Sequence, residues 1–313
     1  CPGNQVGSVD ASCNFALPDY TSLATAAGNC SGLTVTQSPA PGTIVGTGTT
    51  AITLTATDGA SNTANCNFDV VVSDNTNPTI TCPGNQVGSV DASCNFTIPD
   101  YTGLATPADN CPGVVVTQVP APGTNVGVGT SNIVLTATDA SSNTANCNFD
   151  VVVTDVTNPT IACPGNQTGN VDASCNFSLP DYTALATPAD NCPGVTVTQV
   201  PAPGTIVGVG TTNIVLTATD ASSNTANCNF DVVVSDATNP TLICPGNKTG
   251  NVDASCTFAL PDYTALATPA DNCPGLVVTQ VPGPGTIVGA GTTNIVLTAT
   301  DASSNTANCN FDV

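Results

Sequence analysis

The sequence contains no histidine, glutamate, arginine, methionine or tryptophan, and Lys248 is its only basic residue. Catalysis by a serine or cysteine nucleophile needs a base such as histidine or lysine to activate it. Nucleic acids and anionic membranes are bound through lysine and arginine. No apolar run reaches the roughly 18 residues of a membrane-spanning helix. We therefore expect no nucleic-acid partner and no direct membrane insertion.

The acidic residues are all aspartates, 22 in number, and they give the chain a net charge of −21. Two carboxylates in a cleft can hydrolyse glycosides, but these aspartates recur at the same turn and strand-surface positions in every copy of a repeat. The glycines lead into expected strands rather than helices, so no phosphate-binding loop is present. The sequence therefore indicates a protein that is not an enzyme.

All 16 cysteines belong to four series with a period of 81 residues and no insertions. The series are Cys1, Cys82, Cys163, Cys244; Cys13, Cys94, Cys175, Cys256; Cys30, Cys111, Cys192, Cys273; and Cys66, Cys147, Cys228, Cys309. A fixed period of this size predicts tandem modules, each large enough to be a small domain. We place them at residues 1–73, 74–154, 155–235 and 236–313, with the first strand of the first module and the last strand of the fourth truncated.

The most regular stretch of each copy alternates apolar and polar residues on both sides of a polar turn. In the second copy the inward positions are Ile133, Leu135, Ala137, Cys147, Phe149, Val151 and Val153. This alternation predicts a β-hairpin. Shorter strands are expected at 79–82, 86–90, 94–98 and 114–119, separated by turns rich in Pro, Gly and Asp. About seven short strands and no helical period predict an all-β fold of tandem immunoglobulin-like β-sandwich modules.

Three segments of the second copy resemble a known family. They are DNTNPTITCP at 74–83, ADNC at 108–111, and the run from Val126 to Val151 that contains LTATDASSNTANCNFDV. Repeated four times in order, they resemble the hyalin repeat (HYR) module, and in particular the arrays on surface proteins of Bacteroidetes-type bacteria. The resemblance implies immunoglobulin-like sandwiches in a secreted or cell-surface protein, associated with adhesion and extracellular matrix and not with catalysis.

Four cysteines in each small module indicate disulfides formed in an oxidising compartment. Zinc is not expected, because the chain has no histidine and no Cys-x-x-Cys pair. Four cysteines allow three pairings, and alternation turns Cys82, Cys94 and Cys147 inward. The family pattern favours Cys82–Cys147 and Cys94–Cys111. The equivalent pairs are Cys1–Cys66, Cys13–Cys30, Cys163–Cys228, Cys175–Cys192, Cys244–Cys309 and Cys256–Cys273. A cross-link between neighbouring modules stays open as an alternative.

Three aspartates per module junction are expected to meet at one end of an immunoglobulin-like sandwich. In the second module they are Asp74, Asp109 and Asp139, with Asn110 and Asn143 as further oxygen donors. The later sets are Asp155, Asp190, Asp220 and Asp236, Asp271, Asp301. Calcium takes six to eight oxygen ligands, so calcium at the module junctions is one hypothesis, and no cofactor is otherwise required. The alternative is that each Asp or Asn only caps its own turn.

Four asparagines lie in the Asn-x-Ser/Thr pattern that accepts N-linked sugar, namely Asn95, Asn166, Asn176 and Asn247. Asn95 and Asn176 are expected to face outward, because the phenylalanines that follow them are expected to face inward.

We expect a non-catalytic extracellular structural array that forms a stalk, fibre or filament at or beyond the cell surface and associates with neighbouring copies. One alternative is an adhesin whose modules bind surface glycans or proteins, and another is a passive spacer for a domain outside this stretch. The lack of Trp and Arg, the favoured anchors of binding hot spots, disfavours the adhesin. The repeated tyrosines Tyr20, Tyr101, Tyr182 and Tyr263 are expected to pack in a corner of each module.

Overall fold

The computed structural model describes residues 1–29 and 31–313, which form two compact units, Cys1–Val156 and Thr157–Val313. Each unit holds two copies of the 81-residue repeat. Strands dominate both units, and the helices in the described residues are single 3₁₀ turns. The prediction of an all-β fold built from tandem sandwich modules is confirmed. Across residues 1–29 and 31–313, none of the helices has the length and apolar character needed to cross a membrane.

The elements recur in the same order in each module. The first module contains β1 (Gln5–Ser8), β2 (Phe15–Ala16), η1 (Thr21–Leu23), β3 (Thr34–Ser38), β4 (Ile44–Val45), β5 (Gly48–Thr57) and β6 (Thr63–Ser73). The second contains β7 (Thr79–Thr81), β8 (Gln86–Ser89), β9 (Phe96–Thr97), η2 (Thr102–Leu104), β10 (Thr106–Ala108), β11 (Val115–Val119), β12 (Asn125–Val126), β13 (Gly129–Thr138) and β14 (Thr144–Thr154).

The second unit repeats this pattern. Its first module contains β15 (Thr160–Ala162), β16 (Gln167–Asn170), β17 (Phe177–Ser178), η3 (Thr183–Leu185), β18 (Thr187–Ala189), β19 (Thr196–Val200), β20 (Ile206–Val207), β21 (Gly210–Thr219) and β22 (Thr225–Ser235). Its second contains β23 (Thr241–Ile243), β24 (Thr257–Ala259), η4 (Thr264–Leu266), β25 (Thr268–Ala270), β26 (Val277–Val281), β27 (Ile287–Gly289), β28 (Asn294–Thr300) and β29 (Thr306–Asp312).

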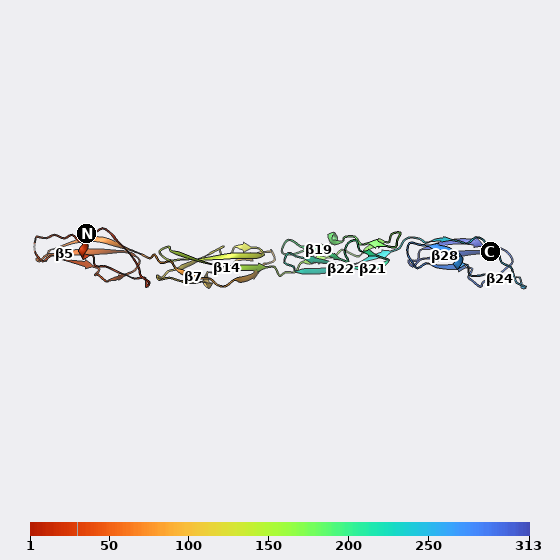
Figure 1. Ribbon diagram of the computed structural model, residues 1–313, viewed down its shortest axis with the longest axis horizontal. Helices are drawn as coiled ribbons and strands as arrows, with labels where there is room; N and C mark the ends of the chain where they lie inside the picture. The colour runs from red at the N-terminus through yellow and green to blue at the C-terminus, as the bar shows by residue number, and fades with distance from the viewer. Residues whose placement is uncertain (30) are drawn as a thin grey trace. The chain divides into compact units, whose positions relative to one another are not determined.

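One four-stranded sheet forms the main layer of the second module, in the order β11-β13-β14-β8. Its centre is the predicted hairpin, in which Ile133 pairs with Phe149 and Leu135 with Cys147. The short strand β8 runs parallel to β14, whereas β11 and β13 are antiparallel. Two-stranded ribbons, β7–β10 and β9–β12, make up the other layer in place of a second full sheet. In the next unit the long strands β21 and β22 run side by side in the same way (Figure 1).

The core lies between these layers and is filled by the alternating residues of the hairpin. Ile133, Leu135, Ala137 and Val151 are fully buried, and Ile98 comes from the opposite layer. The corner tyrosine Tyr101 is buried and meets the Phe149 ring edge-on, with ring centroids 5.3 Å apart. Burial raises the pKa of its hydroxyl. All four tyrosines make this contact, so none is presented as an exposed binding anchor.

Two local expectations are wrong. The strand expected at 94–98 is only Phe96–Thr97, because Cys94 lies in a turn with a positive φ of 59°. The strand expected at 114–119 begins at Val115, and its buried residue near the end is Gln118, whereas Val119 is exposed. Gln118 Oε1 accepts a hydrogen bond from the Tyr101 N–H (2.7 Å), and its Nε2 donates to the carbonyls of Pro99 and Pro120 (3.0 Å each).

We predict that Gln118→Leu lowers the free energy of unfolding of the second module by about 2–4 kcal/mol, because it leaves three polar backbone groups without their partner. Native-state hydrogen exchange at the amides of β13 and β14 measures the effect within this module. Thr117→Val, at the exposed neighbouring position, is the matched control. Equal protection in the two variants would show that the Gln118 bonds do not stabilise the fold.

Candidate functional site at the module junctions

The junction between the first two modules begins with a tight turn at residues 10–14. The Asp10 carboxylate accepts hydrogen bonds from the backbone N–H groups of Ser12 (2.8 Å) and Asn14 (3.0 Å). The Asp10 carbonyl accepts a third from the Cys13 N–H (3.0 Å). These bonds hold Cys13 at a φ of 60°, in the left-handed region. Cys13 is therefore oriented by the turn and not by the pleat of a strand.

This turn is joined covalently to the next module. Cys13 forms a disulfide with Cys111, with the Cα atoms 4.9 Å apart, and Cys175 forms the same bond with Cys273 in the second unit. The alternative of a cross-link between modules is thus the one observed within each unit.

The corresponding pairings within one module are wrong. They are Cys13–Cys30, Cys94–Cys111, Cys175–Cys192 and Cys256–Cys273. The physical reason is the turn, since Cys13, Cys94, Cys175 and Cys256 all have a positive φ and do not begin the inward-facing strand that was expected. Cys94 and Cys192 are also disulfide-bonded, Cys256 is a free, exposed thiol, and Cys30 lies outside the described residues.

The other predicted disulfide is present in every module. The pairs are Cys1–Cys66, Cys82–Cys147, Cys163–Cys228 and Cys244–Cys309, each with a sequence separation of 65. In the second module it joins Cys82, which follows β7, to Cys147 in the first half of β14. Closing a loop of this length stabilises a fold by about 4 kcal/mol in the chain-entropy model.

Asp74 lies in the link between β6 and β7 and is only 3% exposed. Its Oδ1 accepts hydrogen bonds from the Thr76 N–H (3.0 Å) and from the Asn110 amide (3.3 Å). Its backbone carbonyl accepts another from the Asn143 amide (3.0 Å). The link is therefore attached to two separate loops of the second module.

The loop between β10 and β11 contributes Asp109 and Asn110, directly before the bonded Cys111. Asp109 Oδ2 accepts a hydrogen bond from the Cys111 N–H (3.1 Å). The Asn110 amide donates to the carbonyl of Asp10 in the first module (3.1 Å). One loop thus contacts the neighbouring module through both a disulfide and a hydrogen bond.

Asp139 opens the hairpin turn between β13 and β14 and is buried. Its carboxylate accepts hydrogen bonds from the N–H groups of Ser141 (2.9 Å) and Asn143 (2.8 Å) and from the Asn143 amide (2.7 Å). Burial raises the pKa of Asp139, but these hydrogen bonds lower it further, so the pKa lies below the usual aspartate value. The turn-capping role is therefore present, and it keeps this carboxylate ionised.

The three carboxylates meet in one place. One oxygen from each of Asp74, Asp109 and Asp139 lies within 4.8 Å of the others. In the second unit, Asp236, Asp271 and Asp301 have the same arrangement. Two like charges about 5 Å apart repel by about 3 kcal/mol at an effective dielectric of 20. No side chain of the first unit is positively charged, because Lys248 belongs to the fourth module.

Three oxygen atoms at this junction are buried with no hydrogen-bond partner in the described part of the chain, namely Asp74 Oδ2, Asp109 Oδ1 and Asn110 Oδ1. The second unit repeats them at Asp236, Asp271 and Asn272. A buried acceptor without a donor costs about 1–3 kcal/mol, and more when it is charged. Turn capping accounts for the other carboxylate oxygens but not for these. The junction therefore presents acceptors suited to an electropositive ligand.

The first module supplies an internal comparison. Asp58, the counterpart of Asp139, accepts the same hydrogen bonds from Ala60, from the Asn62 N–H and from the Asn62 amide (2.9–3.0 Å). The loop aspartate is replaced by Gly28, and Asp58 belongs to none of the acidic sets found in the described residues. The turn thus forms without the cluster.

The predicted sugar sites have different surroundings. Asn176 is exposed, and Asn95 is half-buried with its amide donating to the Ser93 carbonyl (3.0 Å). Asn166 and Asn247 are exposed, and their Oδ1 atoms accept hydrogen bonds from the N–H groups of Asp231 and Asp312 (3.1 Å each). Glycosylation at these four positions stays a prediction.

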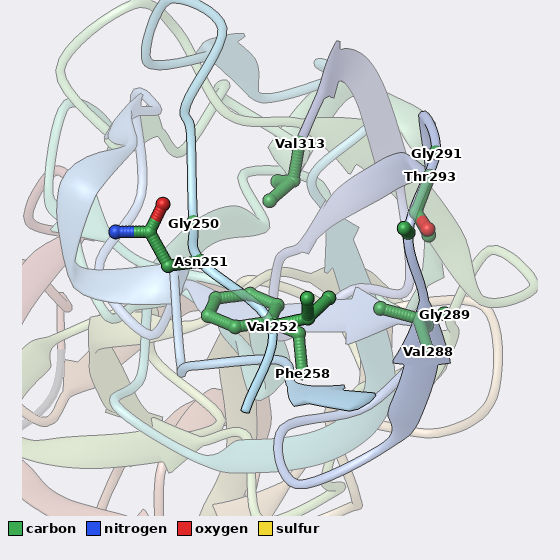
Figure 2. Close-up of a pocket in the computed structure, with 10 residues that line it drawn as sticks. Gly250, Asn251, Val252, Phe258, Val288, Gly289, Gly291, Thr293 and Val313 are labelled. Carbon is green, nitrogen blue, oxygen red and sulfur yellow. The ribbon is translucent and has the colours of Figure 1, made fainter. Parts of the chain in front are cut away.

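A pocket of about 250 Å³ in the fourth module has a different character (Figure 2). Phe258, Val252 and Val313 border it, with Gly250 and Gly291 in its wall. In the second module the equivalent glycines, Gly88 and Gly129, pair with the buried Val153. No charged side chain lines it, and we assign it no ligand.

Sequence reasoning found the three aspartates but missed Asp10 and Cys13 as parts of the junction. A usable signal was the run Asp10-Ala-Ser-Cys-Asn14, because Asp followed by small residues and Asn favours a turn closed by the carboxylate.

The HYR domain model matches residues 2–72, 73–153, 154–234 and 235–313. Hyalin of Strongylocentrotus purpuratus is 30% identical over 288 residues, covering 87% of this chain and 23% of that protein. Hyalin of Lytechinus variegatus is 29% identical over 309 residues, covering 87% of this chain and 57% of its own length. The chain thus spans less than two thirds of either relative.

The solved structures that match the chain include extracellular cadherin domains. A protocadherin gammaB7 EC3-6 structure has a TM-score of 0.34 at 13% identity and covers 99% of this chain and 98% of its own. Human CDH23 EC21-23 has a TM-score of 0.34 at 16% identity and covers 76% of this chain and 100% of its own.

We predict that digestion of the unreduced protein with Asp-N protease releases fragment 10–18 joined to fragment 109–138, because cleavage before Asp19 and Asp109 isolates Cys13 and Cys111. Mass spectrometry identifies the pair, and iodoacetamide should label Cys256 before reduction. Recovery of fragment 91–99 joined to 109–138 would instead establish a pairing within the second module.

Proposed function

The chain belongs to the HYR domain family and is an extracellular, disulfide-bonded repeat protein of the adhesion type; on this premise we propose that it forms a load-bearing stalk or filament at or beyond the cell surface. The observation that carries the proposal is the position of the disulfides along the path that tension would take through the chain.

Tension on the first unit can pass around the sandwich cores. It would enter at Cys1, cross to Cys66, follow the link to Cys82, and cross to Cys147 before leaving through the end of β14. Each closing disulfide removes 65 residues from the stretched path. Only about 16 of the 81 residues per module remain extensible, or about 55 Å at ~3.5 Å per residue. The 65 bypassed residues therefore carry little of the load, which passes instead through the end of β14, with Phe149, and through the link that follows.

The disulfide between modules has a separate role in this proposal. Without it, the first two modules would be joined covalently only through the link that contains Asp74. The Cys13–Cys111 bond adds a second covalent connection, and the hydrogen bond from Asn110 to Asp10 lies beside it. Two attachments restrict bending far more than one, which suits a stiff array.

The ligand-binding adhesin is less well supported by the surface. The repeated tyrosines are buried in all four modules, and the chain has no Trp or Arg to anchor an interface. The exposed edge strands β8 and β11 offer unpaired backbone groups instead. We therefore propose neighbouring copies as the partners, through edge-to-edge contact between sheets. Such an array needs no catalysis.

Single-molecule stretching of the oxidised chain tests the proposal. We expect each unfolding event to lengthen the chain by no more than about 55 Å, because the closing disulfides exclude most of each module. After reduction, each event should approach the full ~280 Å of 81 extended residues, less the folded length. Cys256→Ser is the control and should behave like the parent chain, since that thiol is free. Full-length events in the oxidised chain would refute the load path.

A further inference from the structure

We propose that the junction aspartates of each unit bind one Ca²⁺ ion. In the first unit the ligands are Asp74, Asp109, Asp139 and Asn110. In the second unit they are Asp236, Asp271, Asp301 and Asn272. Two independent observations support this. The carboxylates approach within 4.8 Å of one another, and Asp74 and its neighbours carry buried oxygens with no donor in the described residues. Calcium binding does not depend on the function proposed above, whereas a role of the ion in stiffening the array rests on that function.

A cation is required because the chain cannot neutralise the cluster itself. Asp139 is buried and accepts hydrogen bonds from the Asn143 N–H and amide, and Asp74 is almost fully buried beside it. Buried carboxylates in other proteins are satisfied by a salt bridge or by a bound water molecule. The first unit has no Arg, His or Lys, and the one lysine of the second unit, Lys248, borders a surface hollow with Asp312 and not with the acidic cluster. The three free oxygens lie where the chain excludes solvent. A divalent cation supplies the missing charge and satisfies all of these acceptors at once.

The donor set selects calcium. All the available ligands are hard oxygens, because the chain has no histidine and both Cys13 and Cys111 are oxidised, which disfavours zinc. Ligands of one Ca²⁺ ion, with its usual bond length of ~2.4 Å, lie no more than about 4.8 Å apart, and one oxygen from each of the three carboxylates meets this condition. Magnesium requires ~2.1 Å bonds in a near-ideal octahedron, which three carboxylates from separate loops fit less well.

The surrounding contacts position these ligands. Asn143 donates to both Asp139 Oδ2 and the Asp74 carbonyl, so it orients two ligands and its amide does not itself face the ion. Asn110 donates to Asp74 Oδ1 and the Asp10 carbonyl, which leaves its own oxygen as a ligand. The Cys13–Cys111 bond fixes the loop that carries Asp109 and Asn110.

Calcium titration of the oxidised four-module chain, stripped with EGTA and followed by calorimetry, tests the proposal. Asp109→Asn is the most conservative variant, because the side chain can still accept the Cys111 N–H bond while losing a charged ligand. We expect this variant to bind one calcium ion fewer than the parent chain. Asp58→Asn is the matched control, with the same turn but no cluster, and should lose none.

Thermal unfolding separates a metal ligand from a structural cap. In EGTA, Asp109→Asn should unfold at the same temperature as the parent chain or higher, because one of three repelling charges is gone. In calcium it should gain less than the parent. A variant that unfolds earlier under both conditions, or a parent chain that takes up no calcium, would overturn the proposal. The two proposals fail separately. If the oxidised chain binds calcium but unfolds in full-length stretching events, the load path is refuted and the metal site is not.

Discussion

The rest of the structure depends on the covalent bonds that lie on both sides of the link between the two modules of a unit. On one side, a 65-residue loop is closed by Cys82–Cys147, and on the other a turn of the preceding module is bonded to the loop that ends at Cys111. An 81-residue module has room for only one small core. Here that core is a row of Ile, Leu and Val with one Tyr–Phe pair. Cross-links that restrict the unfolded chain supply stability that a larger core would provide in a bigger domain.

The same chain has to accommodate 22 carboxylates with almost no positive charge. At exposed turns it does so locally, as at Asp100, where hydrogen bonds from the Thr102 side chain and N–H lower the pKa of the carboxyl. Water screens the remaining charge there. The junction differs because Asp74 and Asp139 are buried and share their space with Asp109. Capping by backbone N–H groups satisfies some of these oxygens, but the arrangement leaves others without any donor in the described residues.

Much of the fold and of the site followed from spacing. The 81-residue period, the hairpin around Asp139 and the meeting of three aspartates could be predicted, because alternation and loop position fix them once a sandwich is assumed. The disulfide between modules was harder to predict from the sequence, since the family pattern pairs the cysteines within one module. Backbone conformation decided the outcome. An Asp-capped turn holds Cys13 at a positive φ, and no hydrophobic pattern reports that. Gln118 was missed for a related reason, because its burial depends on hydrogen bonds to the carbonyls of Pro99 and Pro120, which no hydrophobic pattern reports.

The disulfide between modules and the acidic cluster are coupled, because one loop contributes Cys111 to the disulfide and Asp109 to the cluster. Asn110 contacts Asp10 in one module and Asp74 in the link, while its neighbours Cys111 and Asp109 belong to the disulfide and to the cluster. A bond that fixes this loop lowers the conformational entropy lost when the carboxylates are gathered around a ligand. By reciprocity, a ligand that gathers them favours the geometry in which Cys13 and Cys111 meet. The first module has Gly28 at the loop-aspartate position, so there the hairpin turn forms without an equivalent cluster. The acidic set is therefore a property of the junction and not a requirement of the fold.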